Sequence, residues 1–269
     1  MAWKMYRVTL RLLTPLHVGW FKQGNVQRTR PYVTGKALWG ALTARLTRDG
    51  GTGNYQQIGQ EVDQWLAFSY FYPSTDTDGV ALWPWDDPDE FAWLYLNTYA
   101  STALNYEQNS AQEGSLHETE YIAPYTREGG PVYLVGYIFE REGGALHWKE
   151  ALSRLQLGGE RTYGWGRVER QEVVPEGGRL FDKYTADLSG NRPQIQLNDG
   201  SRLLAHALAV GAGAVAARGS LAPLVGRETR DAHRHGGHLS EARICWEPGA
   251  TVSGSQVVQI GEHGLWLLA

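Results

Sequence analysis

The clearest periodic segment of the chain is residues 6–12, where apolar and polar residues alternate strictly. Successive side chains of a strand point to opposite faces of a sheet. The pattern therefore predicts a half-buried strand with Tyr6, Val8, Leu10 and Leu12 on one face. Pro15 ends this strand, since proline cannot donate a hydrogen bond to a neighbouring strand.

A helical pattern follows at residues 36–47, where Leu38, Leu42 and Leu46 form an apolar stripe. Thr34 is the predicted N-cap, because its hydroxyl can accept from a free backbone N–H of the first turn. The segment between the strand and the helix, residues 19–32, shows neither the two-residue period of a strand nor the 3.6-residue period of a helix. It is predicted to be an exposed loop.

The following 130 or so residues contain further elements, and their order defines a fold class. We predict a helix at 57–68, a strand within 90–99, a buried strand at 131–139, a helix at 148–157 and a strand at 167–174. Residues 93–99 and 118–122 flank a polar tip at 105–115 and predict a protruding hairpin. The order matches an α+β, ferredoxin-like (RRM-type) βαββαβ unit with this hairpin inserted at about residues 73–130.

Residues 175–269 form a second region, so we expect domains at 1–174 and 175–269. Pro175 to Gly178 has the composition of a linker, and residues 255–268 predict a terminal hairpin. The region is either a smaller C-terminal domain of its own type or a degenerate second ferredoxin-like unit.

Charge is distributed unevenly along the chain, although the net charge is only −4. Residues 1–48 hold nine Lys or Arg and no Asp or Glu. A polyanion responds to the local field of such a patch rather than to the net charge. The segment therefore favours a nucleic-acid surface, although basic side chains that merely solvate one face would give the same pattern.

Composition narrows the cellular setting. The single cysteine, Cys245, excludes an internal disulfide and a thiolate metal cluster. No apolar run reaches the roughly 18 residues of a membrane span, and the N-terminus lacks a signal-peptide core. We expect a cytoplasmic protein with no membrane partner.

The stretch LGGERTYGWGRV, residues 157–168, combines glycines with arginines and aromatic residues. Glycine backbone N–H groups can surround a phosphate, arginines can clamp it, and aromatic rings can stack on unpaired bases. A tight helix-to-strand turn would also use glycines. The spacing matches neither GxGxxG nor GxxxxGK[ST], so a mononucleotide site is excluded.

Catalytic and metal motifs are weak. His17 follows the first strand. His233, His235 and His238 form a histidine cluster with no obvious carboxylate ligand beyond Asp231 and Glu241. The sequence holds no Ser-His-Asp order and no GxSxG elbow. We predict no catalytic residue, no metal site and no cofactor.

Four motifs together carry a family resemblance: TPLHVG at 14–19, PYVTGKALWGAL at 31–42, GSLHETEYI at 114–122 and LGGERTYGWGRV at 157–168. Over about residues 5–173 the chain resembles the RAMP superfamily of CRISPR-associated proteins, which act in antiviral defence. The resemblance implies a ferredoxin-like fold that binds crRNA, a thumb-like hairpin and a signature glycine-rich loop.

The resemblance also implies a role. A mid-chain glycine-rich loop followed by a second domain is similar to the non-catalytic subunit that grips the crRNA 5′ handle in type III effector complexes. Residues 19–32 lack the Asp with which backbone subunits cleave target RNA. A catalytically silent backbone subunit and a metal-independent pre-crRNA endonuclease remain alternatives. The implied partners are crRNA, target RNA indirectly, backbone RAMP subunits and a large polymerase-like subunit.

The resemblance and the residue types together define a candidate RNA-binding set. It comprises His17, Lys22, Arg28, Arg30, Lys36, Arg45, Gly158, Gly159, Arg161, Tyr163, Gly164, Trp165, Gly166 and Arg167.

Overall fold

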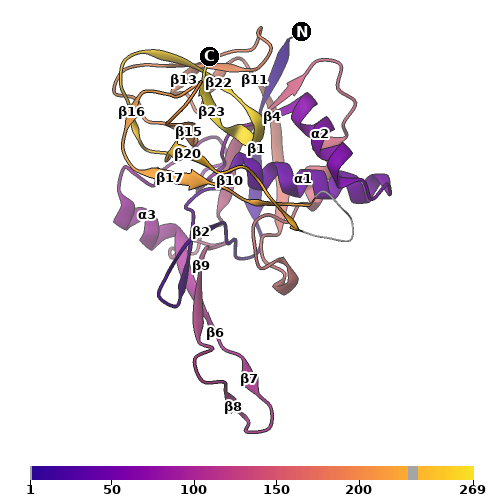
Figure 1. The fold of residues 1–269 in the computed structure, drawn as a ribbon, viewed down its shortest axis with the longest axis vertical. Coiled ribbons are helices and arrows are strands. Elements are labelled where there is room, and N and C mark those ends of the chain that lie inside the picture. The colour runs from indigo at the N-terminus through magenta and orange to yellow at the C-terminus, as the bar shows by residue number, and fades with distance from the viewer. Residues whose placement is uncertain (1, 230–235) are drawn as a thin grey trace.

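The computed structural model describes residues 2–229 and 236–269, and its centre is an antiparallel sheet (Figure 1). The sheet consists of β1 (Trp3–Leu12), β4 (Leu66–Phe68), β5 (Tyr72–Ser74), β10 (Tyr133–Arg141) and β11 (Val168–Glu176). The strand order is β11-β1-β10-β4, and β5 also pairs with β10. Every neighbouring pair is antiparallel.

Helices connect these strands in the order that the sequence predicts. Helices α1 (Gly35–Gly50) and α2 (Tyr55–Trp65) lie between β1 and β4. Helix α4 (Trp148–Ala151) and a 3-10 turn (Leu152–Arg154) lie between β10 and β11. Taking β4 with β5 as one strand, the connectivity is βαββαβ with spatial order 4-1-3-2. The ferredoxin-like prediction is confirmed.

Several local predictions are wrong. The helix expected at 57–68 ends at Trp65, and Leu66–Phe68 form β4 of the central sheet instead. Residues 19–32 are not an exposed loop, because β2 (Gly19–Gln23) and β3 (Val26–Thr29) form a hairpin. Helix α3 (Pro88–Tyr95) replaces the first part of the strand expected within residues 90–99. Asp87 caps α3 by accepting from the N–H of Glu90, and Pro88 occupies its first turn, which together favour a helix start. The helix expected at 148–157 is correct in place but ends early.

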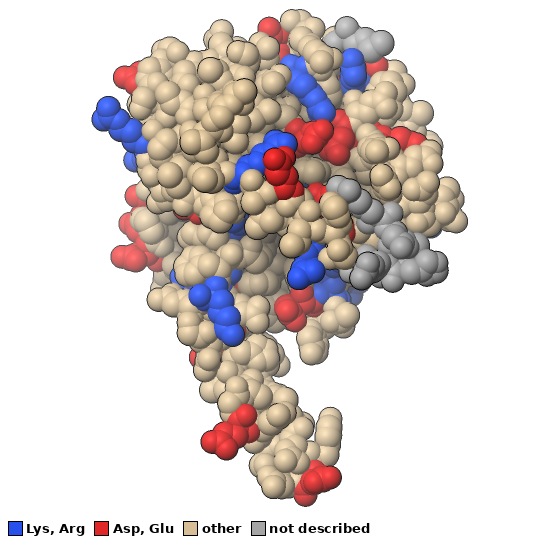
Figure 2. Space-filling view, in the orientation of Figure 1, with Lys and Arg blue, Asp and Glu red and all other residues tan. Residues whose placement is uncertain are grey.

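The protruding hairpin is confirmed, and it is the longest projection of the molecule (Figure 1). Its strands are β6 (Leu96–Ser101) and β9 (His117–Ile122), with a small pair, β7 (Leu104–Asn105) and β8 (Ser110–Ala111), at the tip. We call residues 96–122 the thumb. Strand β9 also pairs with β3, so the thumb and the β2–β3 hairpin share one sheet. Acidic atoms mark the end of the thumb in Figure 2.

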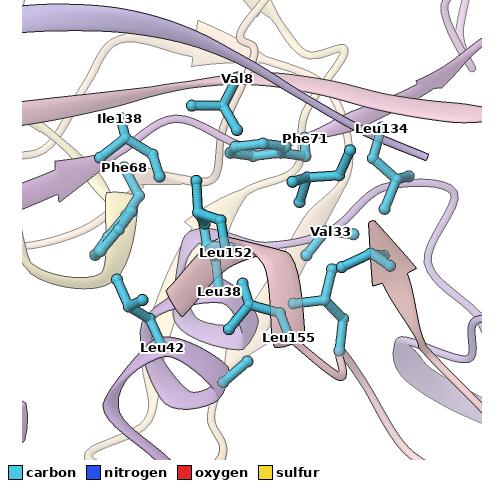
Figure 3. Close-up of a cluster of buried hydrophobic side chains, with 14 of the residues drawn as sticks. Val8, Val33, Leu38, Leu42, Phe68, Phe71, Leu134, Ile138, Leu152 and Leu155 are labelled. Atoms are coloured by element: carbon cyan, nitrogen blue, oxygen red, sulfur yellow. The ribbon is translucent and has the colours of Figure 1, made fainter. Parts of the chain in front are cut away.

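Helix α1 has the predicted N-cap, but it ends at Gly50, three residues beyond the predicted end at residue 47. The Thr34 hydroxyl accepts from the N–H of Ala37, and Gly51 closes the helix in the left-handed conformation at φ 65°. Leu38 and Leu42 are fully buried. Figure 3 shows both side chains pointing at Phe68, Ile138 and other residues of the sheet. This apolar stripe fixes which face of α1 meets the sheet and which face stays on the surface.

Both faces of the central sheet are covered. The even-numbered positions of β1, such as Val8 and Leu10, pack under the helices. Trp3 and Met5 lie on the opposite face and join a second core with the C-terminal region. Burial of β10 on both faces, as its continuous apolar run predicts, follows from this arrangement.

The C-terminal region is built from strands. Its eight-stranded sheet runs β12-β13-β14-β22-β23-β15-β20-β17. The strands are β12 (Arg179–Leu180), β13 (Tyr184–Asp187), β14 (Gln194–Leu197), β15 (Ala207–Leu208), β17 (Leu221–Leu224), β20 (Arg243–Trp246), β22 (Gln256–Ile260) and β23 (Trp266–Leu268). Two small pairs are β16 (Ala217–Arg218) with β21 (Thr251–Val252), and β18 (Arg227–Glu228) with β19 (His238–Leu239).

This region is not a second ferredoxin-like unit. Between residues 177 and 269 the described chain contains no α-helix, whereas a ferredoxin-like unit needs two. The alternative of a degenerate copy is therefore wrong. The terminal hairpin is confirmed as β22 and β23, joined by a turn at Glu262–Gly264. Across the described residues, no helix has the length and apolar content needed to cross a membrane.

Candidate nucleic-acid interface

The glycine-rich loop is folded onto the segment that follows β1. The N–H of Gly166 donates to the Pro15 carbonyl at 2.7 Å, and the N–H of Gly159 donates to the His17 carbonyl at 2.8 Å. The N–H of Arg167 donates to the Thr14 hydroxyl at 2.9 Å. These amides are therefore not available to a phosphate, contrary to the expectation from the sequence.

Glycine is required here by close approach as well as by backbone angle. A Cβ on Gly158, at φ 72°, would lie 2.2 Å from the His17 carbonyl oxygen. A Cβ on Gly166 would lie 1.8 Å from the Leu157 carbonyl oxygen. Only Gly164 meets nothing within 4 Å. The glycines chiefly let the loop pack tightly, which is the second of the two interpretations that the sequence left open.

His17 holds this packing together. It is 6% exposed, and its Nδ1 lies 2.7 Å from the Glu120 carbonyl oxygen of β9. A carbonyl only accepts, so Nδ1 carries the proton and donates. The ring edge faces Gly159. His17 thus ties the thumb to the glycine-rich loop, and its side chain is buried rather than on the surface.

The two aromatic residues of the loop have different environments. The Trp165 ring makes edge contacts with Tyr99 and Tyr121 of the thumb, at centroid distances of 6.0 and 5.1 Å. Tyr163 is 80% exposed. Trp165 therefore anchors the base of the thumb, and Tyr163 is the ring of the loop that is free to meet a partner.

The acid-free N-terminal segment is largely neutralised by acids from elsewhere in the chain. Six of its nine basic residues form ion pairs, namely Lys4, Arg7, Arg28, Arg30, Lys36 and Arg45. Arg28 pairs with Glu120 at 3.2 Å, and Lys36 pairs with Glu228 at 2.8 Å. The uniformly positive surface expected from the sequence is correspondingly smaller in the fold. Lys22 is exposed and has no ion-pair partner among the described residues.

Arg30 is part of a buried polar network. It is 8% exposed, and its Nη1 lies 3.2 Å from Nε2 of His206, whose Nδ1 contacts the Tyr70 hydroxyl at 2.8 Å. Burial, and then the Arg30 charge, lower the pKa of His206 to about 3. Neutral His206 accepts from Arg30, so its proton is on Nδ1. Arg30 therefore lies behind the surface, where it joins the two halves of the molecule.

Arginines from four separate segments meet in one groove. A cavity of about 700 Å³ is lined by Arg45, Arg48, Arg154, Arg161 and Arg227. A second cavity, of about 470 Å³, shares Arg48, Arg161 and Arg227 with it and reaches Gly158 and Gly159. We call the two together the arginine groove. It runs between α1, the glycine-rich loop and the β17–β18 segment.

The groove keeps a positive charge. Asp49 pairs with Arg45 and lies 3.3 Å from Arg154, and the hydrogen bond from Arg45 lowers the pKa of the Asp49 carboxyl. Arg48, Arg161 and Arg227 have no carboxylate partner among the described residues. A planar guanidinium without a carboxylate partner is suited to bidentate phosphate contacts. Arg161 forms no ion pair with its acidic neighbours in the chain, Glu160 and Glu169.

Sequence reasoning missed part of this site. Arg48, Arg154 and Arg227 were not among the candidates, because they are far apart in the chain and only folding brings them together. Arg45 and Arg161, which are both among the candidates, line the same cavity. Arg167 is exposed but does not line the groove.

The profile of the RAMP superfamily matches residues 9–169, which is more than half of the chain. The chain belongs to the RAMP superfamily. No curated protein matches its sequence. Among solved structures, one similar chain comes from the cryo-EM structure of the Type III-B Cmr-beta bound to cognate target RNA. That chain is 11% identical, and the alignment covers 64% of this chain and 96% of that one with a TM-score of 0.42.

RRM domains bind RNA on the sheet face that the helices leave open. In this RAMP protein the C-terminal region covers that face. Tyr137 and Phe139 of β10 point to that face and are buried in the second core, against residues such as Leu180 and Trp266 of the C-terminal region. A base cannot reach these rings without displacing the region that covers them. The groove on the helix side is therefore the better candidate for RNA.

Metal ligands are not assembled in the described part of this RAMP protein. Across residues 2–229 and 236–269, no group of three or more His, Cys, Asp or Glu side chains could hold a metal ion. His233 and His235 lie outside the described residues. His238 is exposed on β19.

Proposed function

We propose that this RAMP protein is a non-catalytic crRNA-binding subunit of a type III CRISPR effector complex in the cytoplasm, and that it grips the repeat-derived 5′ handle. The arginine groove, which borders the glycine-rich loop, is the observation that carries the proposal. Arg48, Arg161 and Arg227 hold phosphates there. Tyr163, exposed on the same loop, is placed to stack on a base.

Two features of the chain support the handle-binding role. The motifs that place it in the family are followed by about 100 residues that form the C-terminal strand region. That region supplies one wall of the groove through Arg227. The handle is therefore held by both parts of the chain, while backbone subunits, the polymerase-like subunit and, indirectly, target RNA contact the remaining surface.

Binding of a labelled RNA with the 5′ handle, compared with a scrambled RNA, tests this function. We expect Arg161→Ala to weaken handle binding about tenfold and to reduce the slope of log K against log salt by about 0.7, the value for one phosphate contact on a single strand. Arg218→Ala is the matched control, because Arg218 is an exposed arginine of β16 that lines neither cavity.

Two outcomes would contradict the proposal. Equal affinity for handle and scrambled RNA, measured with and without partner subunits, removes the handle-binding role. Cleavage of a pre-crRNA by the pure protein shows an endonuclease instead.

A further inference from the structure

We propose that Trp20 and Phe21 form a stacking platform for one unpaired base of the bound RNA. This inference deepens the proposed function and rests on it. The two rings lie near the start of the β2–β3 hairpin, in the segment that the sequence alone assigns to an exposed loop. Their chemistry suits a nucleobase next to a phosphate that the arginine groove holds.

The position of Trp20 connects the platform with the groove. Trp20 lines the 470 Å³ cavity that also contains Gly158, Gly159 and Arg161. Trp20 is 40% exposed and Phe21 is 47% exposed. One wall of this cavity is therefore aromatic, and another carries a guanidinium that has no carboxylate partner among the described residues.

The Trp20 ring is fixed before any ligand arrives. Its indole N–H donates to Oε1 of Glu247 at 3.1 Å, and Phe21 packs edge-on at a centroid distance of 4.7 Å. The Arg30 guanidinium lies 6.0 Å from the ring centroid. Glu247 and Arg30 also approach one another at 3.9 Å. A ring held in this way loses little conformational entropy when a base stacks on it.

Its surroundings favour RNA over a protein partner. Single-strand binding sites combine cations that follow the backbone with aromatic rings on which bases stack. The 470 Å³ cavity supplies both, through Arg48, Arg161 and Arg227 and through the Trp20 ring. Stacking on a ring is tolerant of sequence, so the platform would position a base next to the groove rather than read its identity.

The test separates stacking from phosphate binding. With fluorescein-labelled handle RNA, alone and with partner subunits, we expect Trp20→Ala to weaken binding about 5- to 150-fold, the range that loss of one base–aromatic stack implies. The salt slope should not change, because a neutral ring releases no counterion. Arg161→Ala should change the slope, and Trp20→Phe should restore most of the affinity by keeping a ring.

Trp93→Ala is the matched control, since Trp93 is a 52% exposed tryptophan of α3 that lines neither cavity of the arginine groove. Circular dichroism of each variant checks that the fold persists. A set of handle RNAs, each with one abasic position, identifies the stacked base, because at that position Trp20→Ala should cost nothing further.

The inference and the proposed function fail in different ways. If handle RNA binds specifically but Trp20→Ala leaves the affinity unchanged, the platform is overturned and the function stands. If Trp20→Ala weakens binding equally at every abasic position, the platform stacks no base and the inference is likewise overturned. If no handle-specific binding exists, the proposed function itself is overturned, and the platform with it.

Discussion

Gly164 and Gly166 lie two residues apart in the glycine-rich loop and have similar backbone angles, at φ 83° and 77°. Their surroundings differ sharply. A Cβ on Gly166 would overlap the Leu157 carbonyl, a backbone group that cannot rotate away as a flexible side chain could. A Cβ on Gly164 would meet open space. The pair separates the cost of a left-handed backbone from the cost of a steric clash.

We therefore expect Gly164→Ala to lower the free energy of unfolding by about 1 kcal/mol, which is the left-handed penalty of an L-residue. Gly166→Ala should lower it by at least about 3 kcal/mol, because the loop must also move away from Pro15 and Leu157. Chemical denaturation of both variants measures the difference. Equal losses would show that the loop relaxes freely and is not packed as described.

Single residues also show where sequence reasoning succeeds and where it stops. Thr34 was correctly predicted as an N-cap because capping depends on the next three residues alone. The ion pairs of Arg28 and Lys36 could not be predicted, because the partners Glu120 and Glu228 are 92 and 192 residues away in the chain. Charge patterning along a sequence describes a surface only when no distant acid folds onto it.

At the scale of elements, β1 and the thumb were predicted because each has a local signal. Alternation identifies β1, and a polar tip between two β-rich segments identifies the hairpin. The β2–β3 hairpin was missed for the opposite reason. The residues of β2 are exposed, so they show no alternation of apolar and polar positions that a core would impose. Strand β3 is stabilised by pairing with β9, which lies about 90 residues further on. Nothing local specifies that pairing.

The thumb permits a prediction of its own. Residues 96–116 contain Glu107 and Glu113 and no Lys or Arg. Its tip is exposed, whereas its base is held by Trp165 and His17. Replacing residues 102–116 with a two-residue turn should therefore leave the melting temperature within about 2 °C of the parent and the salt slope of handle binding unchanged.

Differential scanning fluorimetry and the salt titration described above check this expectation. A reduced salt slope in the shortened protein would mean that the thumb contributes to phosphate binding in spite of its acidic tip. A large fall in melting temperature would mean that the tip, and not only the base, contributes to the fold.

At the scale of the whole molecule, two hydrophobic cores pack against opposite faces of the central sheet. Trp3, Tyr137 and Phe139 bury their rings against the C-terminal region, and the Arg30–His206 contact crosses the same boundary. The domain limits at 1–174 and 175–269 follow composition, and Pro175 and Glu176 still pair with β1. The linker-like composition near residue 175 indicates a turn in the chain. It carries no information about how much apolar surface is buried between the two regions that the turn joins.

The two regions should therefore unfold together. We expect a single calorimetric transition for the full chain, with the calorimetric and van't Hoff enthalpies equal.

A fragment of residues 1–176 keeps every strand of the central sheet but exposes the face that carries Trp3, Tyr137 and Phe139. Because a contiguous apolar surface of this kind leads to association, the fragment should bind a hydrophobic dye and aggregate. Two separate transitions, together with a monomeric fragment that binds no dye, would instead show two independent domains. The groove would then be assembled between units that can move apart, and Arg227 would reach the RNA only in the closed arrangement.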